Sequence, residues 1–565
     1  MTASGEGVAS VLTLLEQRAR EWPDRIGYTF LGGGAREVDV SFGALRTAAL
    51  AMARSIASSI VGADRAVLGY PSGQRYLEAV FACLYAGVTP VSGHVAEFGR
   101  AGAVVEGLAR TARATGAQAV LARPRLAALG RETVPEIAWV GDDSAALEDA
   151  LRSGCEPPRI TYVQATSGST GAQKGVALSD ENLLANLRAQ TQLYPVGEGA
   201  VTVSWLPMSH DMGFVGPLLQ PLYSGSRTVF LSPLRFVAEP AAWLRAIARE
   251  GAEISGCPNF GYDHVLRCIS PADLAGLDLS AWRCAISGGE PIGPSTLERF
   301  AEAFRGCGFQ ATSFIAGYGL AEATSVVTAV APEAPVRVRS FDREALRDGM
   351  AVLASGEGRR LVGHGRVAAE HTVVIVDPQA REPLADGMVG EIWVSGPSVA
   401  DGYLGAGEEE NSAFCSTLAD GRGPYLRTGD EGFVFEGELF LSGRSREFIL
   451  VRGVNHAPQD LEATARAASE DLADSRLAAV ALSQEDEEEE RVLLGIELSE
   501  PVDGGSLDLL RADIHLKVVE QHGIKITDLI FLPVGTIPLT DSGKVRRREF
   551  GRRYLDGELG PVAVA

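Results

Sequence analysis

The chain has 565 residues, too many for one ordinary domain, so two or three packed units are expected. Hydrophobic residues make up 46% and charged residues 22%, a composition that excludes a disordered chain. Acidic residues (73) outnumber Lys and Arg (51), and the resulting formal charge of −22 repels a phosphate backbone, so no nucleic-acid partner is expected.

The first 330 or so residues alternate between helical and extended patterns. Helical periodicity predicts helices near Val8–Trp22, Phe42–Ser59 and Tyr76–Ala86, and the apolar runs IGYTFL and AVLGY predict strands between them. Such alternation is typical of α/β layers built on mostly parallel sheets. From about residue 360 to 440, short strands with frequent turn signals predict a β-rich subdomain.

The pattern changes again near Arg444–Glu447. A helix at Leu461–Ser469, strands RLAAVALS and RVLLGIELS joined by the acidic turn Gln484–Glu490, and a helix at Leu507–His522 predict a small α+β unit. The expected fold class is therefore α/β. We expect a large N-terminal domain of layered mixed sheets and helices with a β-rich subdomain (1–445) and a small α+β C-terminal domain (446–565).

Several classes of protein are not supported by the sequence. The N-terminus lacks the basic leader and apolar core of a signal peptide, and no apolar run approaches the ~20 residues that a membrane span needs. The eight histidines lack zinc-ligand spacing. The seven cysteines are scattered without a CxxC pair, which favours buried thiols in a reducing cytoplasm.

The stretch ITYVQATSGSTGAQKGVALS contains the clearest candidate site. An apolar strand enters a loop rich in glycine, hydroxyl groups and one ammonium, all suited to phosphate oxygens, and a second strand leaves it. The loop does not fit the Walker pattern, and taken alone it could equally be a plain Gly/Ser turn. The predicted phosphate-binding residues are Thr166, Ser167, Gly168, Ser169, Thr170, Gly171 and Lys174.

The order TSGSTGxxKG resembles the phosphate loop of the adenylate-forming superfamily of acyl-CoA ligases, peptide-synthetase adenylation domains and luciferases, with Gln173 at a position that is usually Pro. The segments SGGEPI, AGYGLAEAT, YLRTGDEG, SGRSREFILVRG and LTDSGKVRRREF resemble further motifs of that superfamily in the same order, so the resemblance covers essentially the whole chain. It implies ATP and Mg²⁺ as cofactors and a mobile C-terminal domain. The implied nucleotide-binding residues are Gly289, Glu290, Pro291, Gly317, Tyr318, Gly319, Leu320, Asp430 and Arg444.

The resemblance also implies catalytic roles. Glu322 would hold Mg²⁺, Lys544 would be the catalytic lysine of the mobile domain, and Arg446 would lie at its hinge. A carboxylate that attacks the α-phosphate of ATP brings two anions together, and the cations on Glu322 and Lys544 would offset that repulsion. Taken singly, a packed Tyr318 or a solvated Lys544 would need no such role.

Other segments resemble fatty acyl-AMP ligases, which pass their product to an acyl carrier protein. These are SWLPMSHDMGFVGPLLQPLYSG, CPNFGYD, RGVNHAPQDLE and the insertion at 336–366, which in those ligases restrains the C-terminal domain. The resemblance makes His210 a contact to the carboxylate or the α-phosphate, with a packed core histidine as the competing interpretation. Met212, Phe214 and Phe260 become candidates for the acyl-binding wall, although packing alone would also explain Phe260.

The expected function is therefore activation of a fatty acid, or a related carboxylic acid, as acyl-AMP, followed by transfer to a carrier protein. An acyl-CoA ligase, an enzyme for a small or aryl acid, and a non-catalytic nucleotide-binding or acyl-binding protein remain alternatives. A basic cluster near the C-terminus is a candidate docking surface for an acidic carrier, and a solvated helix face is the simpler explanation. The cluster comprises Lys544, Arg546, Arg547, Arg548, Arg552 and Arg553.

Overall fold

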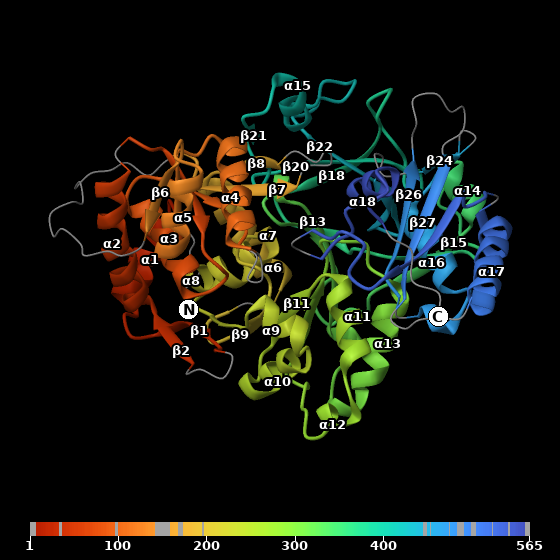
Figure 1. The fold of residues 1–565 in the computed structure, drawn as a ribbon, viewed down its shortest axis with the longest axis horizontal. Coiled ribbons are helices and arrows are strands. Elements are labelled where there is room, and N and C mark those ends of the chain that lie inside the picture. Colours follow the sequence, from red (N-terminus) through yellow and green to blue (C-terminus); the bar gives the residue numbers. More distant parts are fainter. Residues whose placement is uncertain are drawn as a thin grey trace.

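The structure is a computed structural model, and it confirms the α/β class. It describes residues 7–32, 37–60, 62–95, 100–141, 159–167, 173–194, 197–444, 449–451, 454–473, 475–482, 491–498, 504–522, 524–540 and 543–559. Figure 1 shows the N-terminal half of the chain at one side of the molecule and the C-terminal unit at the other.

A seven-stranded sheet lies near the N-terminal end, in the order β21-β8-β7-β4-β3-β5-β6 within the described residues. Its strands from β7 to β6 are parallel, as the alternating pattern predicted, while β8 and β21 are antiparallel. The strands are β3 (Arg65–Gly69), β4 (Thr89–Ser92), β5 (Ala119–Ala122), β6 (Ala138–Gly141), β7 (Tyr162–Ser167), β8 (Gln173–Leu178) and β21 (Tyr403–Leu404). The accompanying helices are α2 (Phe42–Ser59), α3 (Gln74–Tyr85), α4 (Ala101–Thr115) and α5 (Pro124–Thr133).

A nine-stranded sheet in the order β17-β14-β13-β12-β11-β9-β10-β1-β2 forms the second layer in the described chain. Its six central strands, from β13 to β1, are parallel. The strands are β1 (Ile26–Phe30), β2 (Val38–Ser41), β9 (Val201–Ser204), β10 (Arg227–Phe230), β11 (Ile254–Cys257), β12 (Cys284–Ser287), β13 (Phe314–Gly319), β14 (Val326–Ala329) and β17 (Arg366–Val367). The helices are α1 (Val11–Glu21), α6 (Asp180–Leu193), α7 (Asp211–Gly213), the π-helix η1 (Phe214–Leu219), α8 (Gln220–Ser224), α9 (Pro233–Ala238), α10 (Ala241–Glu250), α11 (Asn259–Cys268), α12 (Pro271–Leu274) and α13 (Pro294–Phe304).

Helices α1, α2, α3, α6 and α8 fill the space between these two sheets. A continuous apolar core joins their buried residues to Leu68 and Val176 of the seven-stranded sheet and to Tyr28 and Phe230 of the nine-stranded one. The outer face of the nine-stranded sheet carries a second, aromatic core around the fully buried Trp243. Because both faces of each parallel sheet are covered, the strands read as apolar runs in the sequence.

The predicted β-rich subdomain is a five-stranded antiparallel sheet in the order β19-β18-β20-β22-β23 within the described residues. Its strands are β18 (Thr372–Asp377), β19 (Glu382–Pro383), β20 (Gly390–Ser395), β22 (Leu426–Phe435) and β23 (Glu438–Arg444). The insertion at 336–366 forms a hairpin and a short helix against this sheet, where Phe341 packs on Phe433 and Phe440. These elements are β15 (Val338–Phe341), α14 (Arg343–Arg347) and β16 (Arg359–Val362).

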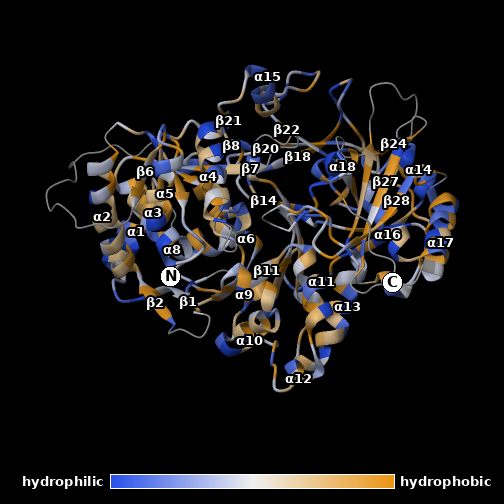
Figure 2. Cartoon of the chain, in the orientation of Figure 1, coloured by the Kyte–Doolittle hydropathy of each residue, from blue (hydrophilic) through white to orange (hydrophobic). Residues whose placement is uncertain are grey.

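The C-terminal unit has the predicted α+β pattern and a core of its own. Its β26, β27 and β28 form a small mixed sheet, and Figure 2 shows β26 and β27 among the hydrophobic segments. The acidic turn predicted at 484–490 lies outside the described residues. The elements are β24 (Ile449–Val451), β25 (Val454–His456), α16 (Pro458–Arg466), β26 (Leu477–Leu482), β27 (Arg491–Leu498), α17 (Gly504–His522), β28 (Asp528–Pro533) and α18 (Arg547–Leu555). None of the described helices has the length and apolar character that a bilayer crossing requires.

Candidate active site

A cavity of about 2100 Å³ opens where the parallel strands β9, β11, β12 and β13 end. The carboxyl ends of parallel strands are the usual place for a ligand site in an α/β sheet. The C-terminal unit contributes Thr540, Gly543 and Lys544 to the opposite wall. The predicted site residues that line this one cavity are Thr166, Lys174, His210, Met212, Phe260, Gly289, Glu290, Pro291, Gly317, Tyr318, Gly319, Leu320, Glu322, Asp430 and Lys544.

The phosphate-loop candidates that the structure describes lie at the ends of β7 and β8. Thr166 pairs with Lys174 in the antiparallel register, so the two arms of the loop are side by side. Ser167 is the last residue of β7, and Gly168, Ser169, Thr170 and Gly171 lie outside the described residues. Lys174 Nζ is 2.6 Å from Glu410 Oε1 and 4.8 Å from the centre of the Tyr403 ring.

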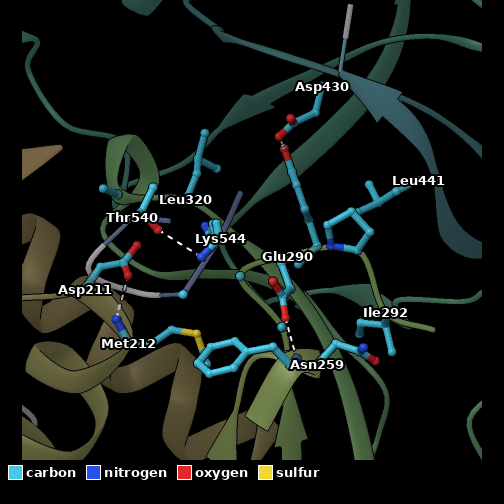
Figure 3. A pocket seen from close by; sticks show the side chains of 18 of the residues that line it. Asp211, Met212, Asn259, Glu290, Ile292, Leu320, Asp430, Leu441, Thr540 and Lys544 are labelled. Atoms are coloured by element: carbon cyan, nitrogen blue, oxygen red, sulfur yellow. Dashed lines mark hydrogen bonds between the residues drawn. The ribbon is translucent and has the colours of Figure 1, made fainter. Parts of the chain in front are cut away.

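Two candidates for adenine and ribose contacts are hydrogen-bonded to each other. The hydroxyl of Tyr318, on β13, donates to Asp430 Oδ2 on β22 at 2.8 Å, and both residues are buried. Figure 3 shows Asp430 above Glu290 and Ile292 in the cavity. Arg444 lies opposite Asp430 in the register of β22 and β23, so the backbone of Arg444 is beside the Tyr318–Asp430 hydrogen bond. The side chain of Arg444 is outside the described structure.

Glu322, the candidate Mg²⁺ ligand, lies in the 3₁₀ turn η4 (Ala321–Ala323) after β13. Its Oε1 accepts a hydrogen bond of 2.6 Å from the hydroxyl of Tyr403, the same residue whose ring lies under Lys174. Asn411 fixes the Tyr403 backbone, because its Oδ1 accepts from the Tyr403 N–H at 2.7 Å. Tyr403 therefore connects the phosphate-loop lysine to the carboxylate.

Sequence reasoning missed Tyr403, although it lies within the predicted β-rich subdomain. It also missed Asp211, which follows His210. His210 Nδ1 and Asp211 Oδ1 are 2.6 Å apart. Burial alone would raise the pKa of Asp211, but the neighbouring His210, the ammonium of Lys544 and the N–H of Met212 together hold that pKa below its usual value. The aspartate is therefore an ionised group in the cavity wall.

Lys544 enters the cavity from a tight turn of the C-terminal unit. The turn is closed by Thr540, whose N–H donates to the Lys544 carbonyl at 2.7 Å and whose hydroxyl oxygen accepts from the Lys544 N–H at 3.0 Å. The preceding Gly543 has a φ of +83° and packs so closely on Phe260 that a Cβ there would lie 2.7 Å from two ring carbons. The turn that carries the lysine is thus seated on the large domain through Phe260. Figure 3 shows Lys544 in the cavity between Asp211 and Glu290.

Glu290 supports this seat from below. Its Oε1 accepts a hydrogen bond of 2.6 Å from the backbone N–H of Phe260, at the start of α11. Burial raises the pKa of Glu290 to about 7, against the opposing effects of the Phe260 N–H and Lys544. Glu290, predicted to bind the nucleotide, is therefore hydrogen-bonded to the start of α11, and this segment contacts the Lys544 turn through Phe260.

The acyl-wall candidates divide into two groups. Met212 and Phe260 line the cavity. Phe214 is instead buried in the core at the start of η1 and stacks on Tyr162, with ring centres 3.7 Å apart. His210 lines the cavity and is 28% exposed, so it is not a core histidine. The hinge candidate Arg446 lies outside the described residues.

The predicted basic docking cluster is largely neutralised by pairing within the C-terminal unit. Arg547 makes two hydrogen bonds to the carboxylate of Glu462, at 2.7 and 2.9 Å, and both side chains are largely buried. Arg548 is exposed. The remaining arginines form the pairs Arg546–Glu549, Arg552–Asp556 and Arg553–Glu558.

Comparison with known proteins agrees with this geometry. The family described as AMP-binding enzyme matches residues 15–404. The chain is 33% identical to the medium-chain-fatty-acid–[acyl-carrier-protein] ligase JamA of Moorena producens, over 98% of this chain and 96% of that protein. It is 32% identical to the 4-hydroxyphenylalkanoate adenylyltransferase of Mycobacterium tuberculosis, over 98% and 92%.

A solved structure from a study of fatty acyl-adenylate ligases from E. coli and L. pneumophila superposes with a TM-score of 0.86 at 30% identity, over 98% of this chain and 99% of that one. The large N-terminal and small C-terminal parts of the fold are shared across that length. The chain belongs to the AMP-binding enzymes, as a member of the fatty acyl-AMP ligase group of the adenylate-forming superfamily.

Proposed function

We propose that this enzyme joins the carboxylate of a fatty acid to the AMP part of ATP and then passes the acyl group to the phosphopantetheine thiol of an acyl carrier protein. The observation that carries the proposal is the seating of Lys544 in the cavity that also holds Tyr318, Asp430 and Glu322. JamA and TtuA, two relatives with 33% and 35% identity, are named as medium-chain fatty-acid ligases for acyl carrier protein.

In the proposed first step, a carboxylate oxygen of the acid attacks the α-phosphorus of ATP, and the bond from that phosphorus to pyrophosphate breaks. Both reactants are anionic, so the step depends on cations placed where charge develops. Lys544 supplies one, and in this structure it lies within electrostatic reach of Asp211 and Glu290. Asp211 also fixes the ring of His210, whose Nε2 has no protein partner among the described residues.

The residues present fit Mg²⁺. No group of three potential protein ligands lies in the described structure, but Mg²⁺ is commonly held by one or two carboxylates together with substrate phosphates. Glu322 is a cavity carboxylate kept in place by Tyr403, across from Lys174. When bound, Mg²⁺ would offset phosphate charge. Lys174 would hold phosphate oxygens after leaving Glu410, and the Tyr318–Asp430 pair would hold the nucleoside.

A carrier protein is preferred over coenzyme A as the acceptor because the insertion contacts the C-terminal unit. Arg359 Nε is 2.8 Å from Asp460, and Arg347 donates to the carbonyl of Gln521 at 3.2 Å. In Figure 1 this places α14 beside α17. These contacts support a C-terminal unit that is restrained in its approach to the large domain. We also propose that the unit (446–565) rotates at Arg446 between the two steps, in a reducing, cytoplasmic setting.

An aryl or phenolic acid is the second candidate substrate, because one relative of nearly full coverage is named for 4-hydroxyphenylalkanoates. A pyrophosphate-release panel of fatty acids of increasing length and of arylalkanoic acids, with purified enzyme, ATP and Mg²⁺, tests the first step. Coenzyme A and a phosphopantetheinylated carrier are then offered separately, and mass spectrometry identifies the acylated acceptor. Acid-independent pyrophosphate release, or none with any acid, would contradict the proposal.

A further inference from the structure

Part of the cavity wall lies away from Lys544, between the helices α6, η1 and α8 and the strands β9 and β11. It includes Gln190 and Tyr194 at the end of α6, Gly216 of η1 and Gln220 of α8, opposite Thr202 and Ile254. An acid whose carboxylate faces Lys544 would extend its tail toward this region, which we name the tail chamber. Three of its polar residues, Gln190, Tyr194 and Gln220, are buried.

Gln220 is 4% exposed, and its amide orientation is determined by a chain of hydrogen bonds. The hydroxyl of Thr191 donates to the carbonyl of Leu187 at 2.9 Å, so its oxygen accepts from Gln220 Nε2 at 2.8 Å. The amide nitrogen is thus used, and Oε1 is left buried with no hydrogen-bond partner among the described residues. A buried acceptor without a partner costs stability, so a ligand that supplies a proton donor is favoured there.

Hydrogen bonds also fix the orientation of the Gln190 amide. The amide nitrogen of Asn186 donates to the carbonyls of Ala323 and Val326, so its Oδ1 is the acceptor for Gln190 Nε2 at 3.2 Å. Gln190 Oε1 consequently points to the other side, toward Gly216, where a Cβ would lie 3.4 Å from it. Two amide oxygens, both acceptors, therefore border the chamber: that of Gln190 faces Gly216, and that of Gln220 is buried in the wall without a partner among the described residues.

Tyr194, which also lines the cavity, adds a hydroxyl on the side of Gly317. The residue is 7% exposed, and its oxygen lies 3.8 Å from the position that a Cβ on Gly317 would take. No other described residue forms a hydrogen bond with this hydroxyl. Two acceptors and one hydroxyl donor match an alcohol or phenol, which can donate to an amide oxygen and accept from the tyrosine.

We propose that the tail chamber selects carboxylic acids whose tail carries a hydroxyl group, with Gln220 and Gln190 as the acceptors that recognise it. The proposal rests on the proposed function, because it names the acid that the same site activates. A pocket built to pair a substrate hydroxyl rejects the analogue without it far more strongly than an apolar pocket rejects an extra methylene. Plain fatty acids would leave the two amide oxygens unpaired.

The first test uses the wild-type enzyme and matched pairs of acids of the same length, one with and one without a hydroxyl. Hydroxyl positions from mid-chain to the terminal carbon and a phenolic acid are included. We expect kcat/KM for pyrophosphate release to favour at least one hydroxylated acid over its plain partner by about tenfold or more. Equal or lower values for every hydroxylated acid would overturn the inference while leaving the proposed function intact.

Variants then assign the preference to the amides. Gln220→Met and Gln190→Met keep side-chain volume but remove the acceptor, so each should lower the preference for the hydroxylated acid and raise kcat/KM for the plain one. Gln310→Met, at an exposed position, is the control and should behave as wild type. A preference unchanged in both chamber variants would refute the assignment, and absence of pyrophosphate release with every acid would instead refute the proposed function.

Discussion

Replacing Gly543 by Ala should slow acyl-adenylate formation much more than it destabilises the fold. An L-residue at a φ of +83° costs about 1 kcal/mol relative to glycine. The new Cβ would lie 2.7 Å from the Phe260 ring, and relieving such overpacking costs about 1–3 kcal/mol. Both costs destabilise the arrangement in which the Lys544 turn packs against Phe260 and Lys544 lies in the cavity. Together, about 2–4 kcal/mol corresponds to a rate loss of about 30- to 1000-fold.

The assay is single-turnover formation of acyl-AMP, with thermal unfolding measured alongside. Gly535→Ala is the matched control, because Gly535 has a φ of +85° and open space around its Cβ position. Gly535→Ala should lower the thermal stability through the same backbone strain but leave the rate of acyl-AMP formation unchanged. Adding Phe260→Leu to Gly543→Ala should recover part of the rate by removing the ring. If Gly543→Ala and Gly535→Ala form acyl-AMP equally fast, the seating argument is wrong.

Three further predictions concern single side chains. Tyr403→Phe removes the hydroxyl that holds Glu322, so the Mg²⁺ concentration for half-maximal nucleotide binding in calorimetry should rise about threefold or more, while nucleotide affinity without Mg²⁺ stays unchanged. Burial lowers the pKa of His522 to about 3, so the folded state keeps the ring neutral, and stability falls as pH drops below about 6.5. Wild type should therefore lose about 2 kcal/mol more unfolding free energy between pH 7 and pH 5 than His522→Gln does. Denaturant titrations at both pH values would show or exclude this difference. Arg548→Glu should impair acyl transfer to a carrier without slowing adenylation. Arg547→Glu would place a carboxylate against Glu462 and should lower the melting temperature. Equal transfer rates in Arg548→Glu and wild type would show that Arg548 takes no part in carrier docking.

Much of the fold could be predicted from the sequence because its elements are strongly periodic. Helix α2 begins and ends where predicted, at Phe42–Ser59, and α1 and α3 differ from prediction by one to three residues at their ends. The strand β28 was missed, because DLIFLP is a short apolar run without alternation. Its place is set by parallel pairing with β27, a long-range contact.

The sequence predicted the site as a set of separate motifs. It did not predict which side chains of different motifs contact each other. Asp211 lies in the segment SWLPMSHDMGFVGPLLQPLYSG and Tyr403 in the predicted β-rich subdomain. Their partners, Lys544 and Glu322, are in another domain or distant in sequence. Phe214 was expected at the acyl wall because its segment resembles that of fatty acyl-AMP ligases, yet in the π-helix its ring stacks on Tyr162. A side chain's direction at such an irregular turn cannot be taken from spacing alone.

Adenylation depends most directly on Lys544, the cation that lets two anions react. Lys544→Ala should reduce single-turnover acyl-AMP formation by at least about a hundredfold. ATP binding measured by calorimetry should change little, since Lys174, Tyr318 and Asp430 lie on the large domain. Formation of acyl-AMP at the wild-type rate by a folded Lys544→Ala enzyme would contradict the account.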